Sequence, residues 1–313
     1  MMAFQWCPTS MKLRISSEEK LLEGLTAPKE VRLVNIGRCV GETDNLIRTL
    51  ILNKDGTGTP ALFIHGFAAA LTTWLLNIDA LARDRPVIVI DVLSFGGSSR
   101  PKFSSDAREA EDQIVKSIAL LMTTIGYEKF ILIGHSMGGF LSSAFALKHP
   151  DRVVHLVLAD PWGFPDPGEP PGNDAAQLHT PLWWKLLDLL HRLANPLFLL
   201  RAVGPFTMTR RCGSYLYRKS AFHSMMVNSN YARFPMVDRI MKLPPLVPIT
   251  FIYGVNSWID RQPGRSIKER WNGPTVKLNV LHGAGHHVYA DRSAEFNHIV
   301  MAACVLGELL HSP

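Results

Sequence analysis

The chain has 313 residues, of which 47% are hydrophobic and 19% are charged, and its formal net charge is +6. This composition can fill a sizeable core and excludes an intrinsically disordered chain. The basic balance favours anionic partners such as lipid headgroups. There is no dense run of Lys and Arg and no aromatic-plus-basic RNA motif, so we do not expect the protein to bind nucleic acid.

The cysteines predict neither a metal site nor a disulfide framework. None of the four forms a C-x-x-C pair, and they are widely scattered: Cys7, Cys39, Cys212 and Cys304. We therefore expect no metal, no cofactor and a reducing compartment. We find no apolar stretch of transmembrane length and no secretory signal. The expectation is a cytoplasmic protein, peripheral at an intracellular membrane surface.

Short apolar segments alternate with helical patterns along most of the chain. Strands are expected at 31–36, 46–52, 60–67, 86–93, 129–135, 153–160, 247–254 and 276–283. Helices are expected at 106–125, from 137 to Pro150, and at 294–310. Such alternation is typical of an α/β fold with a doubly wound, mostly parallel sheet.

One segment interrupts this alternation. Residues 162–246 contain a Pro/Gly loop, an apolar helical pattern and a basic stretch, with no clear strand. We interpret this segment as a helical lid inserted above the sheet. The predicted organisation is an N-terminal segment at 1–30, a core formed by 31–161 and 247–313, and the lid at 162–246.

The sequence Gly134-His135-Ser136-Met137-Gly138 lies between a predicted strand and a predicted helix. Strand–G-x-S-x-G–helix is the pattern of a nucleophile elbow, in which glycines allow a tight turn and the serine is held at a strained backbone angle. We predict Ser136 as a nucleophile, with a purely structural turn as the alternative. The oxyanion hole would use the backbone N–H groups of Met137 and Phe67.

A serine needs a base, and in this pattern the order along the chain is serine, acid, histidine. The loop after the last predicted strand, LHGAGHHVYAD, supplies His286. We favour His286 as the base because it directly follows Ala-Gly in this Gly-rich loop. His287 stays open as an alternative, and His282 is near.

The acid is expected after the strand at 247–254. Its usual place, three residues past Gly254, is occupied by Ser257, and the first carboxylate that follows is Asp260. We therefore predict Asp260 as the acid that orients the imidazole and stabilises the imidazolium. Asp160, at the end of the strand at 153–160, is the second choice.

Five segments extend this motif: HGFAAALTTW, DVLSFGGSSRP, GHSMGGFLSSAFALKHPDRVVHLVLADPWGFP, YGVNSWID and GAGHHVYAD. Together they resemble the α/β-hydrolase-domain proteins 4 and 5, from about Trp6 to the C-terminus. The resemblance implies an α/β-hydrolase fold. The serine-containing branch hydrolyses (lyso)phospholipids, including N-acyl phosphatidylethanolamines. With Ser136 in place, the resemblance implies a serine hydrolase that deacylates (lyso)glycerophospholipids through an acyl-enzyme and a triad of Ser136, Asp260 and His286.

The same resemblance carries two alternatives. The family pattern H-x-x-x-x-D, here His286 to Asp291, has been interpreted as a signature of lysophosphatidic acid acyltransferase, which makes phosphatidic acid. We favour the simpler interpretation, in which His286 is the base and Asp291 caps a helix. The other branch has asparagine in place of the serine and acts as a lipid-droplet co-activator of a triglyceride lipase. An adaptor of that kind, with a lipase partner, is the non-enzymatic alternative.

The resemblance also implies a lipid surface as a partner. The N-terminal tryptophans of the family are implicated in attachment to lipid droplets, and Trp6 is the candidate anchor here. Two features depart from the family. The loop is HGFAAA where the family has HGFGGG, and the lid is shorter, around 215–221.

Overall fold

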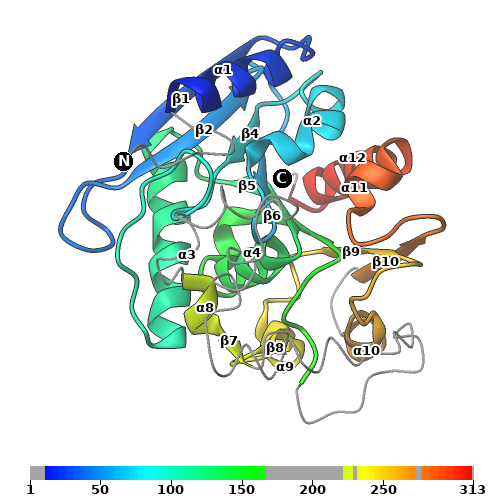
Figure 1. Cartoon of the computed structure of the whole chain (residues 1–313). Coiled ribbons are helices and arrows are strands. Elements are labelled where there is room, and N and C mark those ends of the chain that lie inside the picture. Colours follow the sequence, from blue (N-terminus) through cyan, green and yellow to red (C-terminus); the bar gives the residue numbers. More distant parts are fainter. Residues whose placement is uncertain (1–10, 167–220, 228–230, 272–275, 312–313) are drawn as a thin grey trace, which may run out of the picture.

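The computed structural model describes residues 11–166, 221–227, 231–271 and 276–311. In this part of the chain, eight strands form one sheet in the order β1-β2-β4-β3-β5-β6-β9-β10 (Figure 1). Their bounds are β1 Lys29–Asn35, β2 Leu46–Leu52, β3 Ala61–Ile64, β4 Val87–Ile90, β5 Phe130–His135, β6 Val153–Ala159, β9 Ile249–Gly254 and β10 Val276–Leu281. Within this sheet, only the pairs β1–β2 and β2–β4 are antiparallel. The predicted α/β fold with a mostly parallel sheet is confirmed, and the carboxyl ends of the parallel strands lie at one edge.

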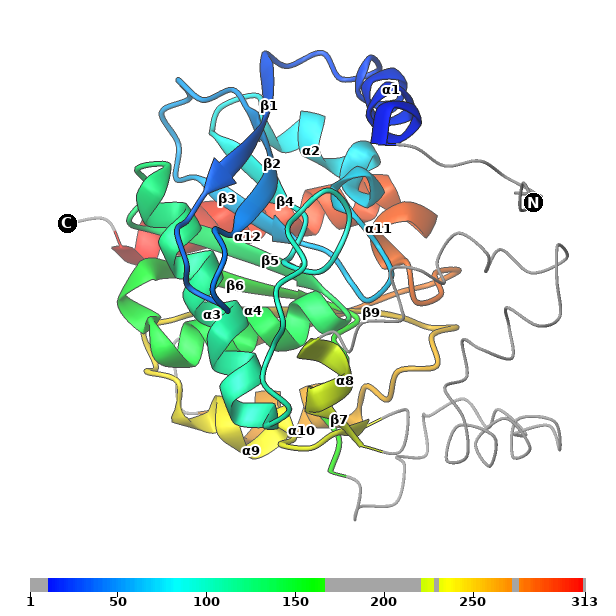
Figure 2. The ribbon, with the colours of Figure 1, turned by 60° about the vertical axis from the view of Figure 1, so that its left-hand side comes forward.

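Helices cover both faces of the sheet (Figures 1 and 2). The helices are α1 Met11–Leu22, α2 Leu75–Leu81, α3 Ala107–Thr124, α4 Met137–Lys148, α8 Ala221–Met225, α9 Met236–Arg239, α10 Gln262–Arg270, α11 Val288–Asp291 and α12 Ser293–His311. The short 3-10 helices are η1 Leu71–Trp74, η2 Pro150–Arg152 and η3 Ile240–Lys242. Buried side chains of α3, α4, α9 and α10 share one hydrophobic cluster with the sheet, and those of α2, α11 and α12 share the other.

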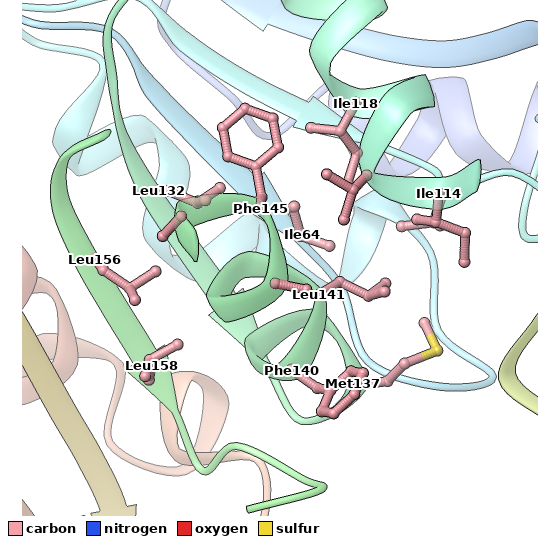
Figure 3. Close-up of a cluster of buried hydrophobic side chains, with 14 of the residues drawn as sticks. Ile64, Ile114, Ile118, Leu132, Met137, Phe140, Leu141, Phe145, Leu156 and Leu158 are labelled. Carbon is pink, nitrogen blue, oxygen red and sulfur yellow. The ribbon is translucent and has the colours of Figure 1, made fainter. Parts of the chain in front are cut away.

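The central strands explain why the core is continuous. Every residue of β3, β5 and β6 is buried, which is typical of parallel strands covered on both faces. In Figure 3, Leu132 of β5 and Leu156 of β6 lie beside Phe145 of α4, with Ile118 of α3 on the same side of the sheet. This packing fixes α4 directly above the strand that ends at the predicted elbow.

The predicted helices have clear local causes. Asp106 caps α3 by accepting hydrogen bonds from the amides of Arg108 (3.0 Å) and Glu109 (2.9 Å). Helix α4 ends at Lys148, just before Pro150, whose ring cannot continue a helix. The helices expected at 106–125, before Pro150 and at 294–310 are thus confirmed as α3, α4 and α12.

Several elements of the described structure were not predicted, among them α1, α2, α10 and the strand pair β7–β8. Helix α1 is held to the sheet by Glu18, which is buried and accepts a hydrogen bond of 2.9 Å from Nε of Arg48 in β2. Within the expected strand-free segment, β7 Met226–Val227 and β8 Tyr231–Ala232 form an antiparallel pair. Most of the predicted lid, residues 167–220, lies outside the described residues, and this includes most of the part expected to be shortened. Trp6 also lies outside them.

One helix corrects the expectation that no apolar stretch of the chain reaches transmembrane length. Among the described residues, α12 is long and apolar enough to cross a membrane, judged by length and composition alone. It contacts β6 and α2, and it buries Phe296, Val300 and Cys304 in the core. A helix that covers a sheet passes the same test, so the finding is weak evidence for a membrane span.

Candidate active site

The turn between β5 and α4 has the geometry of a nucleophile elbow. Ser136 has φ 53° and ψ −118°, a strained conformation for a residue with a Cβ. A Cβ on Gly134 would lie 2.3 Å from the carbonyl oxygen of Gly138, and one on Gly138 would lie 2.3 Å from the carbonyl oxygen of Ile64. Any larger residue at positions 134 and 138 would clash with backbone, so glycine is required at both, as the sequence pattern predicts.

The two predicted oxyanion donors lie on either side of this turn. Met137 is the first residue of α4, where amides have no partner within the helix. Within the described part of the chain, neither the Met137 nor the Phe67 amide donates a backbone hydrogen bond. A Cβ on Gly66 would lie 3.2 Å from the Cβ of Ser136, so the loop that carries Phe67 approaches the elbow closely. Both amides are thus available near the serine.

A buried histidine orients the Phe67 amide. His65 Nδ1 donates to the Gly66 carbonyl oxygen at 2.7 Å, and His65 Nε2 accepts from the Val92 amide at 3.1 Å. Burial lowers the pKa of His65, which keeps the ring neutral with its proton on Nδ1. Because the C=O and N–H of one planar peptide point in opposite directions, fixing the Gly66 oxygen also fixes the Phe67 N–H. The sequence analysis did not identify this role of His65.

The structure pairs the predicted base with Asp160. Nδ1 of His286 lies 2.6 Å from Oδ2 of Asp160, whose side chain is fully buried at the end of β6. Ser257 donates to the same oxygen, and the Gly254 amide lies 3.4 Å from Oδ1. Burial raises the pKa of Asp160, while the hydrogen bonds from His286 and Ser257 lower it. The carboxylate therefore has donors on both oxygens.

This pairing corrects the prediction that Asp260 orients the base. Asp260 instead caps the first turn of α10, where Oδ1 accepts a hydrogen bond of 2.9 Å from the Gln262 amide. The loop after β9 turns at Ser257, whose Oγ accepts from the Ile259 amide at 3.1 Å, and this turn directs the chain toward α10. Asp160, the second choice, occupies the place expected of Asp260. In the sequence, Ser257 occupies the position where the acid usually follows the strand. This missing carboxylate was the signal that the acid comes from another loop.

The loop after β10 brings only one of the three candidate histidines to a carboxylate. His286 is that residue, while Nδ1 of the exposed His287 lies 3.0 Å from the hydroxyl of Tyr289. His282 is exposed, and its carbonyl oxygen accepts a hydrogen bond from Arg292 at 2.8 Å. The geometry thus favours His286 as the base.

A second buried histidine supports this loop from the elbow. His135, next to Ser136, has Nε2 2.9 Å from the carbonyl oxygen of His286. Burial, and then the neighbouring His286, hold the pKa of His135 well below its ordinary value, so its ring stays neutral and donates through Nε2. The rings of His135 and His286 lie 4.6 Å apart between centroids. The elbow and the base loop are therefore joined directly.

The Asp291 carboxylate of the H-x-x-x-x-D pattern has a structural contact. Oδ2 of this exposed residue accepts a hydrogen bond of 2.8 Å from the Gly285 amide. Since Gly285 precedes His286, this bond stabilises the loop that carries the base. Among the described residues, no group of three or more His, Cys, Asp or Glu side chains could hold a metal ion.

Aromatic side chains form a wall beside the elbow. The ring of Phe67 stacks on Phe222 of α8 with 4.4 Å between centroids, and Phe222 lies 4.8 Å from Trp162. The Trp162 amide donates to the carbonyl oxygen of Ser136 at 3.1 Å, which places it next to the serine. Phe222 and Trp162 are buried, so the exposed ring of Phe67 is the part of this wall that could contact a hydrocarbon chain.

Comparison with known proteins extends these observations. The family model described as the alpha/beta hydrolase fold matches residues 59–204. Human 1-acylglycerol-3-phosphate O-acyltransferase ABHD5 is 37% identical, over 95% of this chain and 90% of its own length. Human (Lyso)-N-acylphosphatidylethanolamine lipase is 35% identical, over 95% of this chain and 92% of its own.

Solved structures agree on the fold. A membrane phospholipase A described as a bacterial virulence factor superposes with a TM-score of 0.66 at 20% identity, covering 95% of this chain and 92% of its own. The 2-hydroxy-6-oxo-6-phenylhexa-2,4-dienoate hydrolase of Rhodococcus sp. strain RHA1 gives 0.63 at 19% identity, covering 89% and 99%. At these identities the likeness shows the fold alone.

Proposed function

Because this chain belongs to the α/β-hydrolase-fold family, in the branch of ABHD5 and the (lyso)-N-acylphosphatidylethanolamine lipase, we propose that it is a serine hydrolase that deacylates (lyso)glycerophospholipids. The observation that carries the proposal is the His286–Asp160 pair, 2.6 Å between Nδ1 and Oδ2. The hydrogen bond from His135 to the His286 carbonyl oxygen joins the loop of the base to the elbow of Ser136. The proposal assigns Ser136 as the nucleophile, His286 as the base and Asp160 as the acid.

The reaction follows from this arrangement. The proton on Nδ1 of His286 is held by Asp160, which leaves Nε2 to accept the proton of Ser136. Oγ of Ser136 attacks the ester carbonyl, and the amides of Phe67 and Met137 stabilise the resulting oxyanion. The imidazolium protonates the leaving alcohol, and an acyl-enzyme remains. Water activated by His286 then releases the fatty acid.

The substrate class rests on the relatives and on the aromatic wall. One relative is named as a (lyso)-N-acylphosphatidylethanolamine lipase, so a glycerophospholipid with a fatty acyl ester is the substrate proposed here. The exposed ring of Phe67, packed on the buried Phe222 and Trp162, supplies apolar contact for the acyl chain. A peripheral position at lipid droplets or intracellular membranes, with Trp6 as an anchor, is part of the same proposal.

A second candidate function is acyl transfer to lysophosphatidic acid, supported by the name of the other relative, 1-acylglycerol-3-phosphate O-acyltransferase. The hydroxyl of the acceptor lipid would take the place of water in attacking the acyl-enzyme. If Asp291 belongs to an acyltransferase signature, Asp291→Ala abolishes phosphatidic acid formation and spares hydrolysis. The remaining candidate, a co-activator of a triglyceride lipase, needs no nucleophile, base and acid.

Labelling by a fluorophosphonate probe tests the proposed function first. We expect the wild-type protein to be labelled and the Ser136→Ala variant to be unlabelled, with parallel loss of fatty acid release from lysophosphatidylethanolamine. Circular dichroism of both proteins checks that they are folded. If folded wild type is not labelled, or if Ser136→Ala still hydrolyses the lipid, the proposal is wrong and the co-activator function becomes the better candidate.

A further inference from the structure

Ser257 shares the catalytic carboxylate with the base. Its buried hydroxyl donates to Oδ2 of Asp160, the same oxygen that lies 2.6 Å from Nδ1 of His286. The Ser257 Oγ in turn accepts from the Ile259 amide at 3.1 Å, which fixes its own rotamer. One oxygen therefore receives two donors, from the loop after β9 and the loop after β10.

The sheet order explains how two separate loops reach one oxygen. Strand β9 lies between β6 and β10, so the turn that carries Ser257 lies between Asp160 and the loop of His286. The Asp160 amide donates to the carbonyl oxygen of Ile252 in β9 at 2.7 Å, which keeps the end of β6 against β9. A side chain at position 257 thus reaches the point where the carboxylate meets the base.

We propose that Ser257 is a positioning residue that orients the Asp160 carboxylate, and that the triad acid can be moved from position 160 to position 257. This inference rests on the proposed function, since it assigns parts to the same hydrolase site. An aspartate is one bond longer than a serine, so at position 257 its carboxylate reaches the place of the Asp160 oxygen. Ser257 keeps its proton and acts only through the carboxylate.

Removal of the hydroxyl tests the positioning role. We expect Ser257→Ala to lower kcat/KM for lysophospholipid about tenfold, mainly through kcat, because a charge-assisted hydrogen bond is lost. Ser257→Thr, which keeps the hydroxyl, is expected to recover most of that loss. The matched control is Ser117→Ala, a buried serine of α3 that bonds only its own helix at 2.7 Å, with no expected effect on kcat.

The exchange of side chains tests the movable acid. We expect Asp160→Ser alone to lower activity about ten-thousand-fold, as loss of a triad aspartate does. Asp160→Ser combined with Ser257→Asp is expected to recover at least tenfold of that loss. Because residue 160 has φ 44°, which suits glycine, Asp160→Gly with and without Ser257→Asp repeats the comparison if the serine variants do not fold.

A second readout separates this inference from the proposed function. The low-field NMR resonance of a carboxylate-bound histidine proton reports the contact with His286 whether or not the protein hydrolyses lipid. We expect this resonance in wild type, its loss in Asp160→Ser, and its return in the double variant. If both double variants fold but restore neither the resonance nor activity, the movable acid is refuted, even when wild type is labelled by fluorophosphonate. If Ser257→Ala keeps full activity and the resonance, the positioning role is refuted.

Discussion

The two halves of the candidate site are held in place by different forces. At the elbow, backbone sterics decide the geometry, because a Cβ on Gly134 or Gly138 would lie 2.3 Å from a carbonyl oxygen. On the acid and base side, side-chain hydrogen bonds decide it, since three loops meet at the carboxylate of Asp160. The first kind of constraint involves only backbone: Gly134 meets Gly138 within the motif, and Gly138 meets Ile64 on the neighbouring strand β3. The second joins residues more than 90 positions apart.

The comparison predicts different consequences of mutation for each half. Changes at the elbow glycines should act on folding, because the surrounding backbone has no alternative position to take. Changes around the carboxylate should act on catalysis, because loops can keep their fold while a hydrogen bond is lost. The following predictions test that division.

The largest expected effect is the loss of the acid. Asp160→Asn should lower kcat about ten-thousand-fold, because the amide no longer holds the imidazole in the correct tautomer or stabilises the imidazolium. Asp260→Asn is the matched control and should change kcat less than threefold, because Asp260 accepts the Gln262 amide at the start of α10 and His286 is paired with Asp160 instead. Steady-state hydrolysis of lysophosphatidylethanolamine measures both. A large loss in Asp260→Asn with an active Asp160→Asn would reverse the assignment.

The elbow glycines should show the opposite behaviour. Gly138→Ala is expected to lower the free energy of unfolding by about 3 kcal/mol, because its Cβ meets the Ile64 carbonyl oxygen at 2.3 Å. Gly24→Ala, where the nearest atom is 4.0 Å away, should be neutral or slightly stabilising. Urea unfolding followed by circular dichroism compares the two. If the two variants are equally stable, the backbone at the elbow can shift to accommodate a methyl group, and the prediction is wrong.

These forces also explain what could be predicted from the sequence. The sheet and its helices follow from apolar runs and helical periodicity, and the elbow follows from a five-residue motif whose glycines have a steric cause. The same local reasoning placed the loops of Phe67 and His286. In each case the residues that form the pattern are neighbours in the chain, so the pattern can be recognised from the sequence, although part of its steric cause, the contact of Gly138 with Ile64, lies on another strand.

The acid could not be assigned in the same way. The sequence offered Asp260 and Asp160 near the carboxyl ends of two strands, and the choice depends on which of them the loops bring to His286. That contact spans 126 positions and depends on strand order, with β9 beside β6. The supporting roles of His65 and His135 are also long-range, because each bonds a backbone group in another loop.

Buried neutral histidines predict a pH dependence of stability. Burial lowers the pKa of His155 to about 3, against an ordinary value of 6.5, and His65 and His135 shift in the same direction. The unfolded chain therefore binds more protons, so stability is complete above about pH 6.5 and falls as the pH is lowered. For His155, whose folded pKa is about 3, the loss should be about 1.4 kcal/mol per pH unit below pH 6.5.

His155 isolates this effect because its Nε2 bonds only Thr250, at 2.8 Å, on the neighbouring strand β9. We expect the double variant His155→Leu, Thr250→Val to reduce the loss of unfolding free energy between pH 7.5 and pH 5.5 by about 1.4 kcal/mol. Urea unfolding at both pH values measures it. An unchanged difference would mean that His155 is protonated in the folded protein.

The smallest expected effect is at Asp291, on the exposed side of the base loop. Asp291→Ala removes the hydrogen bond of 2.8 Å to the Gly285 amide, and water can replace it, so hydrolysis should fall only about threefold. Asp291→Asn keeps an acceptor oxygen and should fall less. Phosphatidic acid formation, assayed with lysophosphatidic acid and acyl-CoA on the same preparations, should change in proportion to hydrolysis. Since one loop carries the base for both reactions, only a selective loss of acyl transfer would give Asp291 a chemical role of its own.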